Sequence, residues 1–128
     1  MTMKFQTGVP LGVLGFVPIS AADGEATWEY TVDPAHHNTN GVLHGGVLMA
    51  LLDTAMGQAV GALVEPTGRF NAAAQLNINF LAPVKSGLVR AQAKVKKLGK
   101  RLAVVESEAT DERGRVVAIA TSTHSLLP

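Results

Sequence analysis

The chain has 128 residues, of which 47% are apolar and 16% charged, with a formal net charge of +1 and no cysteine. These values exclude a disordered chain, a disulfide framework and thiolate metal sites, and they argue against a general nucleic-acid or membrane-surface binder. No signal-peptide pattern opens the chain, so we expect a cytoplasmic protein with one domain over residues 1–128.

The first half of the chain predicts two strands and one helix. In chain order, the expected elements are a helical turn around Pro10–Leu14, strands over Phe16–Ala22 and Ala26–Val32, a polar loop over Asp33–Leu43, and a helix from just after His44 to near Glu65-Pro66. Asp23-Gly24 is a strong hairpin signal between the two strands. The proline at the far end is expected to stop the helix.

The second half predicts four strands, because apolar and polar residues alternate along it. Their expected ranges are Ala74–Phe80, Leu88–Lys96, Arg101–Glu112 and Arg115–Leu127. We expect the last three to form an antiparallel meander. In that meander Arg90 and Lys94 would face Glu106 and Glu108 on the next strand, so opposite charges could pair.

The predicted helix is apolar nearly all round, which requires it to be enclosed rather than laid on a surface. Its length is close to the roughly 20 apolar residues of a membrane span. Asp53 and the many small residues favour a buried helix of a soluble protein instead. The predicted fold class is therefore α+β, with an antiparallel sheet wrapped around one long central helix.

Two glycines, Gly45 and Gly46, stand where the helix is expected to begin. Glycine lets a ligand approach the backbone, and a helix start offers unpaired N–H groups and the positive end of the helix dipole. Such groups could stabilise charge on a carbonyl oxygen, as an oxyanion hole does. On their own, the glycines are better explained as a flexible junction between loop and helix.

Asp53 is the only charged residue between His44 and Glu65. It lies roughly 12 Å from the helix start, at 1.5 Å per residue. A carboxylate in an apolar helix is costly unless it is paired or functional, and a desolvated one is suited to act as a general base. The alternative is a structural Asp that bonds to Thr54, Gln58 or a neighbouring subunit.

Taken together, Asn38, His44-Gly45-Gly46 and Asp53 resemble the signature of hotdog-fold acyl-CoA thioesterases. The segments Leu76–Pro83 and Lys97–Ala103 are similar to the branch that contains the phenylacetate-pathway and mammalian hotdog thioesterases. The likeness covers nearly the whole chain. The combination is specific, whereas no single segment is.

This resemblance implies a catalytic site shared by two subunits. The Gly45 amide would polarise the thioester carbonyl, Asn38 would support the same oxygen, and His44 would hold the loop and orient Asn38. Asp53 would act from the partner subunit, as general base or as nucleophile. A thiolate leaves readily, so one carboxylate suffices without a metal or a cofactor, CoA being part of the substrate.

The resemblance also implies substrate contacts outside this group. Where relatives place a Ser or Thr that positions water, this chain has Ala73, for which Asn71, Thr54 or Gln58 could substitute. Gly46 would lie beside the thioester. The candidates for contact with CoA phosphates are Arg69 and the cluster Lys94, Lys96, Lys97, Lys100 and Arg101, although such charges are also common on solvated strand edges.

The histidines are not expected to bind metal. His36, His37 and His44 lack helical i, i+4 spacing and a nearby acidic ligand, which argues against zinc. His124, on the last predicted strand, is expected to be structural.

We expect a homo-oligomer, either a dimer or a dimer of dimers (a homotetramer), with active sites between subunits and acyl-CoA as the substrate. Neither nucleic acid nor a membrane is expected as a partner. Two alternatives stay open: a non-catalytic acyl-CoA-binding hotdog module, and a hotdog hydratase or dehydratase.

Overall fold

The computed structural model describes residues 14–128, so the predicted turn around Pro10–Leu14 lies almost wholly outside the described residues. Its elements are β1 (Val17–Ala22), β2 (Glu25–Thr31), the 3-10 turn η1 (Pro34–His36), α2 (Gly45–Val64), the 3-10 turn η2 (Glu65–Thr67), β3 (Phe70–Phe80), β4 (Leu88–Leu98), β5 (Leu102–Thr110) and β6 (Val116–Leu127). The predicted strands and the helix are confirmed. The largest difference is at β3, which begins at Phe70 rather than Ala74.

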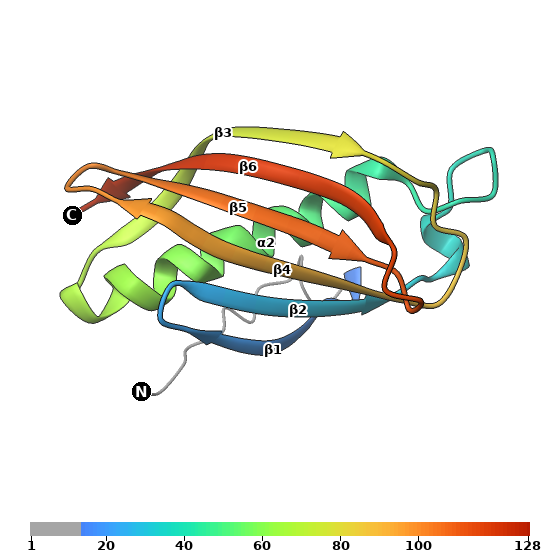
Figure 1. Ribbon diagram of the computed structural model, residues 1–128, viewed down its shortest axis with the longest axis horizontal. Coiled ribbons are helices and arrows are strands. Elements are labelled where there is room, and N and C mark those ends of the chain that lie inside the picture. Colours follow the sequence, from blue (N-terminus) through green and yellow to red (C-terminus); the bar gives the residue numbers. More distant parts are fainter. Residues whose placement is uncertain (1–13) are drawn as a thin grey trace.

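The strands form one antiparallel sheet in the order β1-β2-β4-β5-β6-β3, and α2 runs along one face of it (Figure 1). β4, β5 and β6 form the predicted meander. β3 precedes the meander in the sequence but pairs with its last strand, so it becomes an edge of the sheet. The predicted α+β architecture is therefore confirmed.

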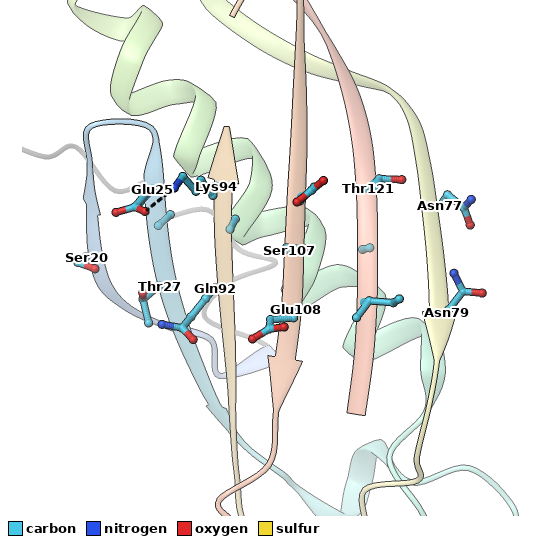
Figure 2. Close-up of a pocket in the computed structure, with 15 residues that line it drawn as sticks. Ser20, Glu25, Thr27, Asn77, Asn79, Gln92, Lys94, Ser107, Glu108 and Thr121 are labelled. Carbon is cyan, nitrogen blue, oxygen red and sulfur yellow. Dashed lines mark ion pairs between the residues drawn. The ribbon is translucent and has the colours of Figure 1, made fainter. Parts of the chain in front are cut away.

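The outer face of the sheet, away from α2, is polar and carries a hollow of about 640 Å³ (Figure 2). Its ion pairs differ from the predicted ones. Arg90 pairs with Glu29 at 2.7 Å, because β2 is the other neighbour of β4 and places Glu29 directly opposite. Lys94 lies opposite Glu106 as predicted, but it pairs with Glu25 of β2, on its other side, at 3.9 Å. Lys96, in turn, pairs with Glu106 at 3.9 Å. Exposed pairs of this kind contribute little to stability.

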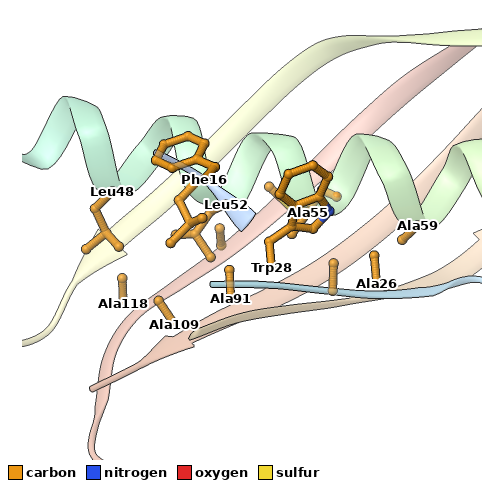
Figure 3. Packing of buried hydrophobic residues seen from close by; sticks show 14 of the residues in the cluster. Phe16, Ala26, Trp28, Leu48, Leu52, Ala55, Ala59, Ala91, Ala109 and Ala118 are labelled. Atoms are coloured by element: carbon orange, nitrogen blue, oxygen red, sulfur yellow. The ribbon is translucent and has the colours of Figure 1, made fainter. Parts of the chain in front are cut away.

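The inner face of the sheet holds the core. Its residues under the helix are mostly small, which lets α2 pack closely on the strands (Figure 3). Leu48, Leu52 and Ala55 of α2 face the sheet along this stretch, and Trp28 lies near Ala55; all four side chains are buried. Burying one such large apolar side chain stabilises the fold by about 1.5–3 kcal/mol.

The helix is covered on one face only, so the expectation that it is enclosed on all sides is wrong for a single chain. Gly46, Met49 and Asp53 are exposed, and the neighbouring Ala50 and Gly57 are only half-buried. The sheet contacts α2 from one side, which leaves the opposite side of the helix uncovered. The carboxylate of Asp53 is thus not desolvated by its own chain.

The segment Gly45–Thr67 is long and apolar enough to cross a membrane, with a mean hydropathy of 1.7 in its most apolar window. The core helix of a soluble protein has the same property. In this fold eight side chains of α2 are buried, which accounts for the hydropathy without a membrane.

Substitution of Leu52 by alanine should lower the free energy of unfolding by about 2–5 kcal/mol, because Leu52 is fully buried between α2 and the sheet. Leu98→Ala is the matched control. Leu98 is 46% exposed, so its loss should cost about 0.5 kcal/mol or less. Urea unfolding of both variants at one protein concentration measures the difference. Equal losses would contradict the described packing of α2.

Candidate active site

His44 forms the start of α2. Its Nδ1 accepts a hydrogen bond of 3.1 Å from the N–H of Gly46, so the ring proton lies on Nε2 and the side chain caps the helix. The N–H of Gly46 is therefore occupied. The N–H of Gly45 has no partner among residues 14–128, and it stays available as a donor at the positive end of the helix dipole.

The loop before the helix is held by hydrogen bonds from both sides. The N–H of His44 donates to the carbonyl of His36, and the Nε2 of His37 donates to the carbonyl of Lys85 at 2.8 Å. Tyr30 holds His36 in turn through a 2.6 Å contact between its hydroxyl and Nδ1. Burial raises the pKa of Tyr30, which keeps this hydroxyl protonated and able to donate.

A pocket of about 320 Å³ opens beside this loop and is lined by both Asn38 and Gly45. The Oδ1 of Asn38 accepts from the N–H of Asn40 at 2.9 Å, whereas its Nδ2 has no partner among the described residues. Two N–H donors without a protein partner therefore border one pocket. No hydrogen bond joins the His44 side chain to Asn38 in the described chain, so His44 acts on the helix start.

Phe80 limits the space over Gly45. A Cβ atom added at Gly45 would lie 3.1 Å from Cζ of Phe80, although the ring is 50% exposed. Leu43, Leu48 and Val84 complete an apolar wall of the same pocket. The pocket therefore joins a polar end, at the donors, to an apolar one.

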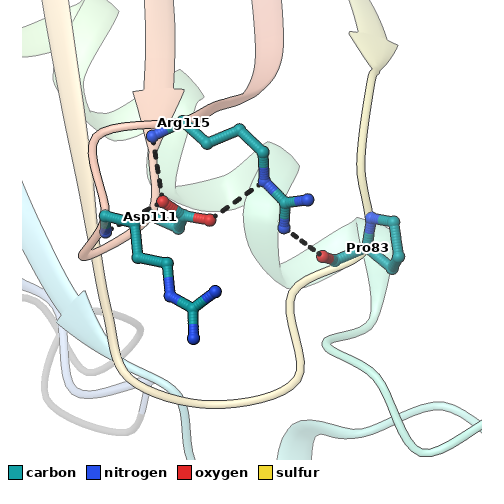
Figure 4. Close-up of polar contacts among 4 residues, drawn as sticks. Pro83, Asp111 and Arg115 are labelled. Carbon is teal, nitrogen blue, oxygen red and sulfur yellow. Dashed lines mark hydrogen bonds and ion pairs between the residues drawn. The ribbon is translucent and has the colours of Figure 1, made fainter.

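A polar cluster behind the pocket supports its wall. Asp111 accepts hydrogen bonds from the N–H groups of Arg113 and Arg115 and from the Arg115 guanidinium, which also reaches the carbonyl of Pro83 at 3.5 Å (Figure 4). Desolvation alone would raise the pKa of Asp111, but these hydrogen bonds outweigh it and lower the pKa. The carboxylate thus stays ionised and ties the β5–β6 turn to the pocket wall.

Asp53 lies two turns along α2 from Gly45, on the uncovered face. Strand β3 runs beside α2 in the opposite direction, since Phe80 meets Gly45 at one end and Asn71 meets Gly57 at the other. Between these contacts, β3 has an irregularity in its pairing with β6, between Ala73 and Gln75. Bulges of this kind are common beside active sites.

The three side chains considered as substitutes at Ala73 differ in availability. Asn71 is engaged at both ends, because its Nδ2 donates to the carbonyl of Gly57 at 3.2 Å and its Oδ1 contacts the Nδ1 of His124 at 2.8 Å. Thr54 donates to the carbonyl of Ala50. The side chain of the half-buried Gln58 has no hydrogen bond within residues 14–128, so it is the one of the three that is free to contact a ligand.

Comparison with known proteins decides the family. Residues 40–118 match the Thioesterase superfamily, which is more than half of the chain. The chain is 31% identical to a 1,4-dihydroxy-2-naphthoyl-CoA hydrolase of Listeria monocytogenes, over 86% of this chain and 89% of that protein. It is also 33% identical to the proofreading thioesterase EntH of Klebsiella pneumoniae, over 80% of this chain and 74% of that one.

The chain belongs to the Thioesterase superfamily. The solved structure of the E. coli PaaI protein from the phenylacetic acid degradation operon matches with a TM-score of 0.89 at 27% identity, over 96% of this chain and 87% of that one. The resemblance to hotdog-fold thioesterases is thereby confirmed. The names of the relatives support a thioester hydrolase.

The two hollows described above differ in what they contain. The larger one, in Figure 2, includes none of the residues expected in catalysis. The smaller one combines Asn38 and Gly45 with an apolar wall. We therefore choose the smaller hollow, at the start of α2, as the candidate site, because of the residues that line it and not because of its volume.

The basic candidates lie far from Gly45 of the same chain. Arg69 donates to the carbonyls of Lys100 at 2.8 Å and Leu126 at 3.1 Å, and Arg101 is bound to the same corner through its carbonyl. This corner lies at the C-terminal end of α2 (Figure 1). The 20 residues of α2 span about 30 Å, so these side chains are nowhere near the helix start of their own chain.

One part of the site was not predicted from the sequence. His124 is 1% exposed and joins a buried chain of polar groups with Asn71 and Ser122. Burial lowers its pKa from the ordinary value of 6.5, while the negative charge of Asp53 acts in the opposite direction. A lone histidine within an alternating strand carries no sequence signal for this, because Asn71 lies on β3, 53 residues away in the sequence, and meets His124 only through strand pairing. No group of three residues suited to hold a metal occurs in the described part of the chain.

Replacing Asp53 by asparagine should lower the pKa of His124 further, because the carboxylate charge that favours the protonated ring is removed. Titration of the His124 ring by NMR measures the shift. Glu108→Gln, on the outer face of the sheet, serves as the control and should leave the pKa unchanged. A His124 pKa that is equal in Asp53→Asn and wild type would show that the two groups do not interact.

Proposed function

We propose that this chain hydrolyses acyl-CoA thioesters to a free acid and CoA. The observation that carries the proposal is the pocket at the start of α2, where the N–H of Gly45 and the Nδ2 of Asn38 lack protein partners beside an apolar wall. Membership of the Thioesterase superfamily and the named relatives support the same chemistry.

In this proposal the thioester carbonyl oxygen accepts hydrogen bonds from Gly45 and Asn38. As the carbonyl carbon becomes tetrahedral, negative charge develops on this oxygen, and prepositioned donors stabilise it. The His44 cap contributes indirectly, because it occupies the Gly46 N–H and leaves that of Gly45 without a partner. The acyl chain then lies along Leu43, Leu48, Phe80 and Val84.

Asp53 supplies the other half of the reaction. It accepts a proton from a water molecule whose oxygen attacks the carbonyl carbon, the C–S bond breaks, and the CoA thiolate leaves and takes up a proton. The same carboxylate could instead attack directly and form an anhydride that water then hydrolyses. In either case one acidic residue and no metal suffice, and Gln58 is the free side chain that could hold the water.

The two halves of the site are proposed to come from different subunits. Gly45 and Asp53 are eight residues apart on one helix, or about 12 Å, too far for both to reach one carbonyl group. Two features support a second copy of the chain as the partner. The face of α2 that carries Asp53 is uncovered, and β3 is an edge strand of 11 residues without a charge to protect it.

An antiparallel pair of α2 helices would set Asp53 of the partner subunit opposite Gly45, and symmetry would produce two equivalent sites. The same pairing would bring the corner with Arg69, Lys100 and Arg101 toward the helix start of the other subunit. These residues could then contact CoA phosphates there. A dimer is the smallest assembly that meets these requirements, and a dimer of dimers meets them equally.

The test is release of CoA thiol across a panel of aromatic and aliphatic acyl-CoA substrates, with chelator present. The wild-type protein should release thiol, and Asp53→Asn should lower kcat by about 10²–10⁴, the usual effect of removing a general base. Asp53 is exposed in the chain, so the variant should keep the wild-type fold.

Circular dichroism and gel filtration check that fold. Glu108→Gln, a neutralised carboxylate on the outer face, is the matched control and should retain full turnover. Binding of acyl-CoA without thiol release would favour a ligand-binding module, and hydration of an enoyl-CoA would favour a hydratase. Wild-type turnover by Asp53→Asn would remove this residue from the mechanism.

A further inference from the structure

His124 is a buried titratable group that the proposed reaction does not use. It lies on the inner side of β6, directly opposite Ala73 of β3 in the strand pairing, and it is 1% exposed. Both ring nitrogens have partners at 2.8 Å, the Oδ1 of Asn71 and the Oγ of Ser122. A buried imidazole with two partners is held in one orientation.

The partners determine where the ring proton lies. The Nδ2 of Asn71 donates to the carbonyl of Gly57, so its Oδ1 faces His124 and can only accept. The Nδ1 of His124 must therefore carry the proton. In the neutral ring, Nε2 then accepts from the hydroxyl of Ser122, which also has the sulfur of Met56 at 3.2 Å as an alternative acceptor.

This chain of hydrogen bonds ends on the helix turn that carries Asp53. Gly57 follows Asp53 by four residues, so in the helix its N–H donates to the carbonyl of Asp53 while its own carbonyl accepts from Asn71. The order is His124, Asn71, Gly57, Asp53. Each member is a short or rigid group, and the chain crosses from β6 through β3 to α2.

We propose that His124 is a positioning residue for Asp53: through Asn71 it fixes the turn of α2 that presents the carboxylate to the thioester. The inference rests on the proposed function of Asp53. The proposal also accounts for the alanine at position 73. The polar group that holds this region is His124, which lies opposite Ala73 on the neighbouring strand β6.

The electrostatic surroundings of His124 are simple. Its neighbours across the sheet are Ala73 on β3 and Ala103 on β5, and the helix contributes Met56 and the charge of Asp53. Burial lowers the pKa of His124, so the ring is neutral at pH 7 and the assigned tautomer applies under assay conditions.

Two substitutions of His124 distinguish a positioning role from a side chain that only fills space in the core. The amide nitrogen of His124→Asn can replace Nδ1 and keep the hydrogen bond to Asn71, whereas that of His124→Gln replaces Nε2 and loses it. We expect the Asn variant to keep kcat within about 3-fold and the Gln variant to lose about 10-fold or more, both with KM unchanged. A side chain that only fills space would give the opposite order, since Asn leaves the larger cavity.

A control variant and a double variant complete the test. Thr121→Val, on the outer face of the same strand, is the control and should keep wild-type kcat. In an Asp53→Asn background, His124→Gln should cause no further loss, because the two act on one step. Equal kcat for the Asn and Gln variants, or a full additional loss in the double variant, would overturn the inference.

If neither His124 variant folds, Asn71→Asp applies the same test. It keeps an acceptor toward His124 but sets an oxygen against the carbonyl of Gly57, so kcat should fall at unchanged KM, and wild-type kcat would overturn the inference. If Asp53→Asn itself retains turnover, the proposed function fails instead. A loss in Asp53→Asn with equal rates in the His124 variants would reject the positioning role alone.

Discussion

The packing of α2 along one face of the sheet is the interaction on which the rest of the structure depends. Alanines such as Ala91 and Ala118 line the inner face beneath the helix, and Leu51, Leu52 and Met56 are fully buried against it. This contact fixes the direction of the helix relative to β3. It therefore fixes where Gly45, at the helix start, and Asp53, two turns later, can act.

The same packing divides the helix into a covered and an uncovered side. The covered side makes the core, and the uncovered side carries Asp53 among small residues. A carboxylate and a free backbone donor on one rigid helix cannot meet at one carbonyl, because about 12 Å separates them. Because the helix is rigid, we propose that a second chain supplies the carboxylate that completes the site. The buried His124–Asn71 pair fits this view, since it secures the turn from the covered side.

Much of the fold could be predicted from the sequence. Alternation along the strands and the apolar run after His44 are short-range patterns, and the elements appear close to the predicted ranges. The start of β3 was missed, because its first residues are followed by a run of alanines and a bulge that hide the alternation. The ion-pair partners of Arg90 and Lys94 were missed because the sequence does not show that β2 pairs with β4.

The candidate site was predictable where its residues are close in sequence. Asn38 and Gly45 line one pocket and His44 caps the helix beside it, whereas the expected bond between His44 and Asn38 is not formed among the described residues. The exposed position of Asp53 was not predictable, because an apolar composition does not reveal which side of a helix the sheet covers. Nor was the role of Asn71 and His124, which are 53 positions apart and meet only once β3 pairs with β6.

The central claim is that each active site combines Gly45 and Asn38 of one subunit with Asp53 of the other, and subunit mixing tests it most directly. Asp53→Asn and Asn38→Ala proteins are combined in equal amounts under conditions that allow exchange, which native mass spectrometry verifies. Half of randomly mixed dimers are then heterodimers with one intact site of two, so the account predicts recovery to about a quarter of the wild-type rate. No recovery despite proven exchange would show that each chain contains its whole active site.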